Sequence, residues 1–276
     1  LEFRRVLFRS GLDQFGVAGR VVAPHQVQSR YNFLRGSDFD EIRVYDRMLD
    51  AEGVARATVE SVAENTSDAV VAPPEHSAQF SERVVHLPGC YQPNSRARPC
   101  AARPTRAVEG LPEEALVLCS FNQTYKLTPE VFAVWLEALR ETPLAVLWLW
   151  ASNPWAEDEL RRVAQAAGVD PIRLIFAEGR AQPGHLARLP LADLALDTFP
   201  CNGHTTTSDA LWAGVPVLTW QGEVFAARVA SSLLAAAGLD DLIAVSLADY
   251  RSRLLRWCAD AAWRADLAAR AGALRE

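Results

Sequence analysis

From about residue 111 onward, short apolar runs alternate along the chain with helix-like patterns. Runs with the length of buried strands cover 115–121, 145–150, 172–177, 194–197 and 217–220. The segments between them repeat their apolar residues every three or four positions, as amphipathic helices do. This alternation, with short connections, predicts a parallel sheet that helices cover on both faces.

Capping residues mark the helix boundaries. Thr128 is a candidate N-cap before Pro129, and the helix that follows gathers on one face Phe132, Trp135, Leu136 and Leu139. Thr205 or Thr206 is expected to cap a helix that ends before Gly214. Further helices are predicted over 157–167, 184–189, 225–237 and from 247 to the end of the chain.

The N-terminal part is less regular. Strands are predicted at 69–72 and 84–87 with a short helix at 75–82 between them, and the Arg- and Pro-rich stretch 95–110 is predicted to be a linker. Residues 1–10 carry no fold signal and are interpreted as a cloning or assembly remnant. The stretch 37–54 is similar to the last strand and helical tail of laminin-G-like lectin domains, although an arbitrary strand–helix piece explains it equally well.

Composition narrows the function classes. The 276 residues have a net charge of −6, which argues against nucleic acid and anionic membranes as partners. No apolar run approaches the length of a membrane span. The five cysteines and five histidines show no metal-ligand spacing, so we expect free thiols, no metal ion and a reducing, cytoplasmic location.

Lysine is almost absent from the chain. Of the 28 Lys and Arg residues, Lys126 is the one lysine. A compact ammonium is a phosphate ligand that Arg does not simply replace, so Lys126 is a candidate functional residue. Chance survival of a single lysine explains the composition equally well.

The richest candidate chemistry lies between the strands 194–197 and 217–220. Six hydrogen-bonding side chains cluster there: Asn202, His204, Thr205, Thr206, Thr207 and Ser208. Such groups at a helix N-terminus can hold a pyrophosphate. Asp209, expected in the first helical turn, suits a sugar hydroxyl. The alternative is that the hydroxyls only cap the helix and Asp209 only complements its dipole.

Polar clusters follow four of the predicted strands: Gln123 with Lys126, residues 182–188, residues 204–209 and residues 221–223. A parallel sheet gathers such positions along its carboxyl edge, so we expect them to form a single site.

The stretch DTFPCNGHTTTSDALWAGVPVLTW resembles the nucleotide-sugar site of SPINDLY-like O-linked N-acetylglucosaminyltransferases and their bacterial relatives. The resemblance runs from about Asp68 to the end of the chain. It implies a GT-B type α/β fold, here with a nearly complete C-terminal Rossmann-like lobe and a remnant of the first lobe. The expected organisation is an unassigned, artefactual or chimeric segment at 1–67, the remnant and linker at 68–110, and the UDP-sugar-binding lobe at 111–276.

The resemblance also implies roles for single residues. Lys126 would neutralise the departing diphosphate, with Gln123 hydrogen-bonding nearby. His185 and Arg188 match a His-x-x-Arg pair that holds uracil, although on spacing alone a solvent-facing pair is favoured. Gln182 stands where many members carry Lys. His204, Thr205 and Thr206 would surround the pyrophosphate, and Asp209 would bind the ribose.

The implied function is inverting, metal-independent transfer of N-acetylglucosamine from UDP-GlcNAc to a protein Ser or Thr hydroxyl. UDP-glucose-dependent transfer to Asn and a non-catalytic UDP-sugar-binding fragment are alternatives. An epimerase or phosphorylase of the same fold is a further one, and the phosphorylase is disfavoured because the one lysine is already placed at the phosphate. The expected partners are a UDP-sugar and a protein or peptide acceptor, and no general base can be assigned.

Overall fold

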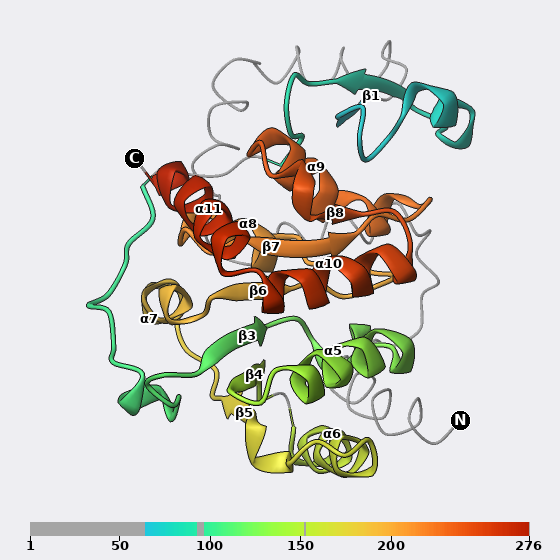
Figure 1. Ribbon diagram of the computed structural model, residues 1–276. Coiled ribbons are helices and arrows are strands. Elements are labelled where there is room, and N and C mark those ends of the chain that lie inside the picture. Colours follow the sequence, from blue (N-terminus) through green and yellow to red (C-terminus); the bar gives the residue numbers. More distant parts are fainter. Residues whose placement is uncertain (1–63, 93–96, 152, 276) are drawn as a thin grey trace, which may run out of the picture.

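A computed structural model describes residues 64–92, 97–151 and 153–275. Its main feature is a parallel sheet with strand order β5-β4-β3-β6-β7-β8 (Figure 1). The strands are β3 (Leu116–Ser120), β4 (Ala145–Trp150), β5 (Leu174–Ala177), β6 (Leu194–Leu196), β7 (Val217–Trp220) and β8 (Ile243–Ala244). The predicted parallel α/β sheet is confirmed.

The strand order reverses between β3 and β6. From β3 the chain adds β4 and β5 on one side, and it then returns to place β6, β7 and β8 on the other. β3 pairs with β6 through Leu118↔Leu194 and Cys119↔Ala195. In open α/β sheets, ligands bind where the carboxyl ends of two such strands diverge. The topology therefore singles out the ends of β3 and β6.

Helices cover the sheet. They are α5 (Pro129–Glu141), α6 (Pro154–Ala166), α7 (Gln182–Arg188), α8 (Thr205–Trp212), α9 (Val229–Ala236), α10 (Leu247–Ala259) and α11 (Ala261–Gly272). The Thr128 side chain caps α5 as predicted, accepting from Val131 N. α5 and α10 pack together in front of the sheet in Figure 1. α8 and α9 also contact β7.

Burial on both faces explains the continuous apolar character of the strands. Val217 and Leu218 point to opposite faces of the sheet, and both are at most 2% exposed. Trp135 of α5 and Trp148 of β4 are both 0% exposed. Each buried large side chain contributes about 1.5–3 kcal/mol relative to exposure to water.

Two local predictions were wrong, and one strand was not predicted. Residues 69–72 form a turn, because the Asp68 side chain accepts from Val70 N and Val71 N. β1 (Glu64–Ser67) lies just before this turn. The helix predicted over 225–237 is divided at Arg228 into the 3-10 turn η6 (Phe225–Ala227) and α9. β8 was not predicted, since two residues make no visible apolar run.

The N-terminal described segment docks on the second lobe. β1 pairs in parallel with β2 (Arg83–His86), and the 3-10 turn η1 (Pro74–Gln79) connects them. Asp68 Oδ2 accepts from Ser232 Oγ at 2.6 Å, and Arg228 Nε donates to Val70 O at 2.6 Å. The interpretations of residues 1–10 and 37–54 lie outside the described residues.

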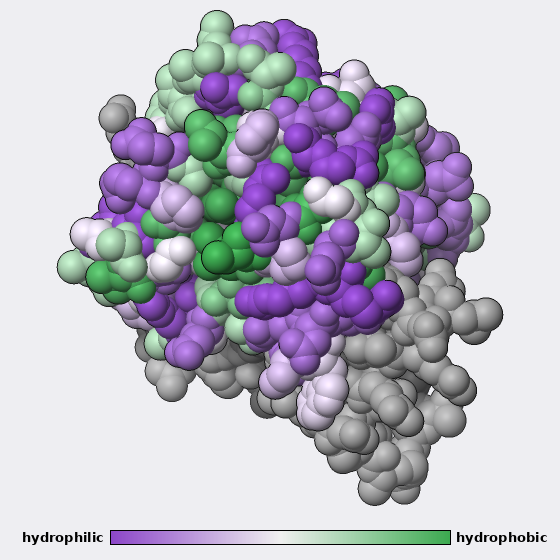
Figure 2. All heavy atoms as spheres, turned by 60° about the horizontal axis from the view of Figure 1, so that its bottom comes forward, coloured by the Kyte–Doolittle hydropathy of each residue, from purple (hydrophilic) through white to green (hydrophobic). Residues whose placement is uncertain are grey.

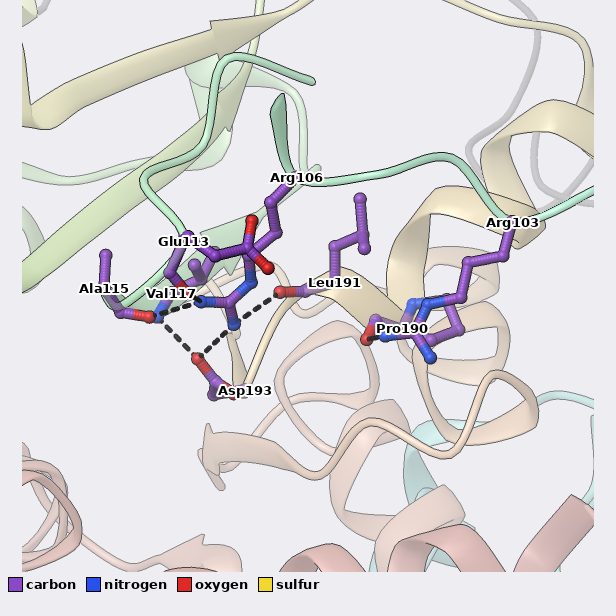
Figure 3. Close-up of polar contacts among 8 residues, drawn as sticks. All are labelled: Arg103, Arg106, Glu113, Ala115, Val117, Pro190, Leu191 and Asp193. Carbon is purple, nitrogen blue, oxygen red and sulfur yellow. Dashed lines mark hydrogen bonds and ion pairs between the residues drawn. The ribbon is translucent and has the colours of Figure 1, made fainter. Parts of the chain in front are cut away.

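The linker is anchored at the amino edge of the sheet (Figure 3). Arg106 Nη1 donates to Glu113 O at 2.8 Å and Ala115 O at 2.7 Å. Arg106 Nη2 reaches Asp193 Oδ2 at 3.1 Å, and the same oxygen accepts from Val117 N. One guanidinium therefore joins the linker to the starts of β3 and β6.

The surface seen in Figure 2 intersperses hydrophilic and hydrophobic residues. Exposed large apolar side chains include Leu144, Trp155 and Ile172, each at least 70% exposed. Within the described residues, no helix is both long enough and apolar enough to cross a membrane.

Arg106→Ala should lower the free energy of unfolding by about 2 kcal/mol, because it removes the ion pair with Asp193 and the donor to several backbone carbonyls. Urea denaturation would measure this. Arg103→Ala is the matched control, since Arg103 in the same linker is exposed and donates to a single acceptor, Pro190 O. Equal losses in the two variants would contradict a clamp centred on Arg106.

Candidate nucleotide-sugar site

The loops that follow β3 and β6 meet at the carboxyl edge of the sheet. Lys126 Nζ donates to Asn202 O at 2.9 Å, and Thr206 Oγ1 donates to Asn122 Oδ1 at 2.7 Å. These contacts bring together residues about 80 positions apart in the chain. The predicted convergence of Lys126 with the loop that carries His204 is therefore present in the structure.

The buried side chain of Asp197 holds the loop that follows β6. Its carboxylate is 3% exposed and accepts from the backbone N–H groups of Thr198 at 2.8 Å and Gly203 at 2.6 Å. It also accepts from Thr219 Oγ1 at 2.7 Å and Asn122 Nδ2 at 3.3 Å. Burial raises its pKa to about 6, although the bonds from Thr219, Gly203 and Thr198 and the Lys126 charge oppose the shift. Asp197 thus fixes the loop by several bonds at once.

The threonines do not cap α8, which corrects the prediction. His204 is the N-cap residue and makes no side-chain cap, while Thr205 begins the helix. Because the helix starts there, Asp209 lies in the second turn and not in the first. The backbone N–H groups of Thr205 and Thr206 donate to no described residue. They remain available to an anion, as helix N-termini typically are.

Buried polar atoms without partners lie at this edge. Within the described residues, Ser120 Oγ, Asn202 Oδ1 and His204 Nε2 have no hydrogen-bond partner. Burial and then the Lys126 charge lower the pKa of His204 to about 4, so its imidazole is neutral at neutral pH. An unpaired buried donor or acceptor costs about 1–3 kcal/mol. A ligand that bonds these atoms would recover that cost.

His185 and Arg188 form a second group, held by Phe121 after β3. The Arg188 guanidinium lies over the Phe121 ring at 4.8 Å and donates to Glu178 O at 2.7 Å. It also donates to His185 Nδ1 at 3.3 Å. Since guanidinium only donates, Nδ1 is the unprotonated nitrogen and Nε2 carries the proton. Burial and the Arg188 charge lower the pKa of His185 to about 4.

Asp209 is engaged by the linker. Arg98 Nη1 lies 2.7 Å from Asp209 Oδ1, and Arg98 Nη2 donates to Ser208 Oγ at 3.1 Å. The Asp209 and Arg98 side chains are 8% and 9% exposed. Burial raises the pKa of Asp209, while the Arg98 charge opposes this shift.

The remaining predicted residues are less closely tied to the others. Gln123 precedes the 3-10 turn η3 (Thr124–Lys126) and lines a hollow together with Ser120 and Asn122. Gln182 is exposed at the start of α7 and makes no hydrogen bond to the other site residues. Within the described residues, no group of three or more His, Cys, Asp or Glu side chains could hold a metal ion. Metal independence stays a prediction.

Comparison with known proteins shows the family of this chain. Residues 92–276 match the family model "Glycosyl transferase family 41". The chain belongs to glycosyl transferase family 41. The matched range contains every candidate site residue, including the linker residue Arg98.

Curated family 41 relatives carry nucleotide-sugar names. The SEC protein of Arabidopsis thaliana, named a probable UDP-N-acetylglucosamine–peptide N-acetylglucosaminyltransferase, is 40% identical over 68% of this chain and 20% of its own length. A Caenorhabditis elegans protein named UDP-N-acetylglucosamine–peptide N-acetylglucosaminyltransferase is 39% identical over 60% of this chain and 14% of its own. The chain therefore spans a fifth or less of these relatives.

Solved structures support the GT-B type fold. A mutant O-GlcNAc transferase of Thermobaculum terrenum superposes with a TM-score of 0.68 at 30% identity, over 77% of this chain and 40% of that one. A sucrose-phosphate synthase of Thermosynechococcus elongatus gives a TM-score of 0.52 at 16% identity, over 80% of this chain and 55% of that one. The second likeness concerns the fold alone.

Sequence reasoning missed Asn122, Asp197 and Arg98. Asn122 directly follows the predicted strand 115–121, and Asp197 is the last residue of the predicted strand 194–197, so their position at the sheet edge could have identified them. Arg98 gave no comparable signal, because it lies in an aperiodic linker among several other arginines.

Gly203→Ala should disturb the loop. A Cβ at residue 203 would lie 2.4 Å from Thr206 Oγ1 and 2.8 Å from Thr207 Oγ1. We expect a loss of about 1–3 kcal/mol in the free energy of unfolding, measured by urea denaturation. Gly272→Ala in α11 is the matched control, since its Cβ would meet nothing within 4 Å. A neutral Gly203→Ala would contradict the tight loop.

The two neutral histidines should make the fold acid-labile. The pKa values of His185 and His204 are lowered from 6.5 to about 4. As pH falls from 6.5 to about 4, the unfolded chain binds protons that the folded chain does not. Stability should therefore fall, by up to ~1.4 kcal/mol per pH unit for each imidazole. Below pH 6, protonation of Asp197 in the folded state offsets part of this loss.

Thermal melts across this pH range would measure the effect. His185→Asn and His204→Asn should each flatten the pH dependence of the melting temperature. His76→Asn in η1 provides the control. A wild-type melting temperature that stays constant from pH 7 to pH 4.5 would count against buried, neutral imidazoles.

Proposed function

We propose that this chain binds a UDP-sugar and forms the donor half of a protein glycosyltransferase. The proposed donor is UDP-N-acetylglucosamine, and the proposed acceptor is a protein Ser or Thr hydroxyl. The names of the family 41 relatives support this donor and a peptide acceptor, and the name O-GlcNAc transferase of the Thermobaculum terrenum protein supports transfer to oxygen. The observation that carries the proposal is the meeting of Lys126 with the uncapped N-terminus of α8 and the unpartnered His204 Nε2.

Charge stabilisation is the proposed chemical contribution of these groups. As the sugar departs, negative charge grows on the diphosphate. Lys126 and the backbone N–H groups at the start of α8 are fixed by the loop contacts before reaction, so they would stabilise that charge without rearranging. The neutral His204 would donate one hydrogen bond and add no charge of its own.

The α7 group supports nucleoside binding. Because Arg188 fixes the proton of His185 on Nε2, that nitrogen would donate to a carbonyl oxygen of uracil. Arg188 itself is 2% exposed, so direct contact of its guanidinium with uracil stays a prediction. Contacts of Gln123 and Gln182 with the donor are also predictions.

Several finer features belong to the same proposal. We infer inversion at the sugar and independence of metal ions from the family resemblance. The five cysteines, Cys90, Cys100, Cys119, Cys201 and Cys258, are all free, which supports a reducing, cytoplasmic location. A UDP-glucose-dependent transferase and a non-catalytic binding fragment are the alternative functions. No described side chain is assigned as general base.

Lys126→Ala should reduce UDP affinity tenfold or more, since charge-assisted bonds to phosphate are about twice as strong as neutral ones. Isothermal titration with UDP and with uridine would test this. The loss should be confined to UDP, because uridine lacks the phosphates.

Arg162→Ala is the control, since its surface ion pair with Glu159 lies on α6. Unchanged UDP affinity in Lys126→Ala would remove Lys126 from the site. Titration with UDP-GlcNAc and UDP-glucose would identify the preferred sugar, and a hydrolysis assay would separate turnover from binding alone.

A further inference from the structure

The linker places an arginine against the candidate site. Arg98 forms an ion pair with Asp209, bonds Ser208, and lies 5.9 Å from the centre of the Trp212 ring. These three residues belong to α8, the helix whose N-terminus is proposed to hold the diphosphate. The guanidinium and the carboxylate are both largely buried, so water screens their interaction only weakly.

The described part of the linker, from residue 97 onward, is held at several points. Ala101 N donates to Pro183 O of α7 at 3.0 Å, and Glu109 pairs with Arg180, just before α7, at 2.6 Å. With the Arg106 clamp at the amino edge, these contacts fix the path of the chain after Arg98 (Figure 1, Figure 3). The linker thus borders both helices that carry candidate nucleoside contacts.

Asp209 creates an electrostatic problem for a diphosphate ligand. It lies three residues after Thr206, or about 4.5 Å along the helix axis. A carboxylate so close to the proposed phosphate position would repel the ligand, and burial without a partner would raise its pKa further. The Arg98 guanidinium offsets this charge and opposes the rise in the pKa of Asp209.

The ion pair uses only one of the two carboxylate oxygens of Asp209. Arg98 occupies Oδ1, and Oδ2 receives no hydrogen bond from the described residues. A carboxylate oxygen in this position suits a vicinal hydroxyl pair of a sugar.

We propose that Arg98 is a positioning residue of the donor site, which holds Asp209 toward the ribose hydroxyls and offsets its charge beside the diphosphate. This inference rests on the proposed function. It makes the linker a part of the donor site. It also assigns to Arg98 a role in UDP affinity that is separate from holding the linker against α8.

The test is a double-mutant cycle with UDP titrated into the full chain by calorimetry. Arg98→Ala should weaken UDP binding about tenfold or more, because it leaves a buried charge unpaired beside the ligand. Arg98→Gln, which keeps a donor but removes the charge, should weaken binding nearly as much. In an Asp209→Asn background, Arg98→Ala should cost less than about threefold, since the charge to be offset is already absent.

Arg103→Ala is the matched control, because it removes a linker arginine that contacts Pro190 O instead of α8. It should leave UDP affinity unchanged. Equal UDP affinity of Arg98→Ala and the control would overturn the inference. Tighter UDP binding by Arg98→Ala would also overturn it, since Arg98 would then obstruct the ligand. An equal fold-loss of UDP affinity on Arg98→Ala in the wild-type and Asp209→Asn backgrounds would overturn it as well.

Failure of the proposed function can be distinguished from failure of the role of Arg98. If the wild-type chain melts cooperatively but binds no UDP, both the function and the role of Arg98 are wrong. If wild type binds UDP, Lys126→Ala loses it and Arg98→Ala does not, the function stands and only the role of Arg98 is wrong.

Discussion

The buried carboxylate of Asp197 is the constraint on which the candidate site depends. Two backbone N–H groups, a hydroxyl and an amide all donate to it, and each comes from a segment that must be in place for the loop to form. From below, Tyr250 OH donates to Asp197 O at 3.3 Å and accepts from Trp135 Nε1 at 2.9 Å. Hydrogen bonds therefore connect α5 and α10 to the loop that begins at Asp197. Loss of the Asp197 carboxylate would leave several buried donors unsatisfied, at about 1–3 kcal/mol each.

The site is consequently assembled from separate parts of the sequence. The segment after β3 supplies Asn122 and Lys126, and the segment after β6 supplies the loop with Asp197 and then α8. Helix α7 supplies His185 and Arg188, and the linker adds Arg98. No single one of these parts could hold a nucleotide diphosphate, because each contributes only a few donors. The reversal of strand order between β3 and β6 is what brings them within contact.

The sequence predicted best the features that local chemistry determines. The strands at 145–150 and 217–220 have the predicted bounds, because a short, continuous apolar run is typical of a strand that is buried on both faces of a sheet. The Thr128 cap was also predictable from Pro129. The caps proposed for Thr205 and Thr206 failed for the opposite reason: Asn122, more than 80 residues away, takes the Thr206 hydroxyl. Likewise, nothing near Arg98 in the sequence indicates that its partner is Asp209.

The lone lysine brings composition and structure together. Of the 28 Lys and Arg residues, all but Lys126 are arginine, so nearly every basic side chain of this protein is a guanidinium. Among the described residues, the Lys126 ammonium donates one hydrogen bond, to Asn202 O, so two of its three protons are not used within this part of the chain. A planar guanidinium with five fixed donors would demand further acceptors from a loop whose carboxylate is already saturated. The geometry around Asn202 therefore favours an ammonium at this position for a physical reason, and a chance survivor becomes the weaker explanation.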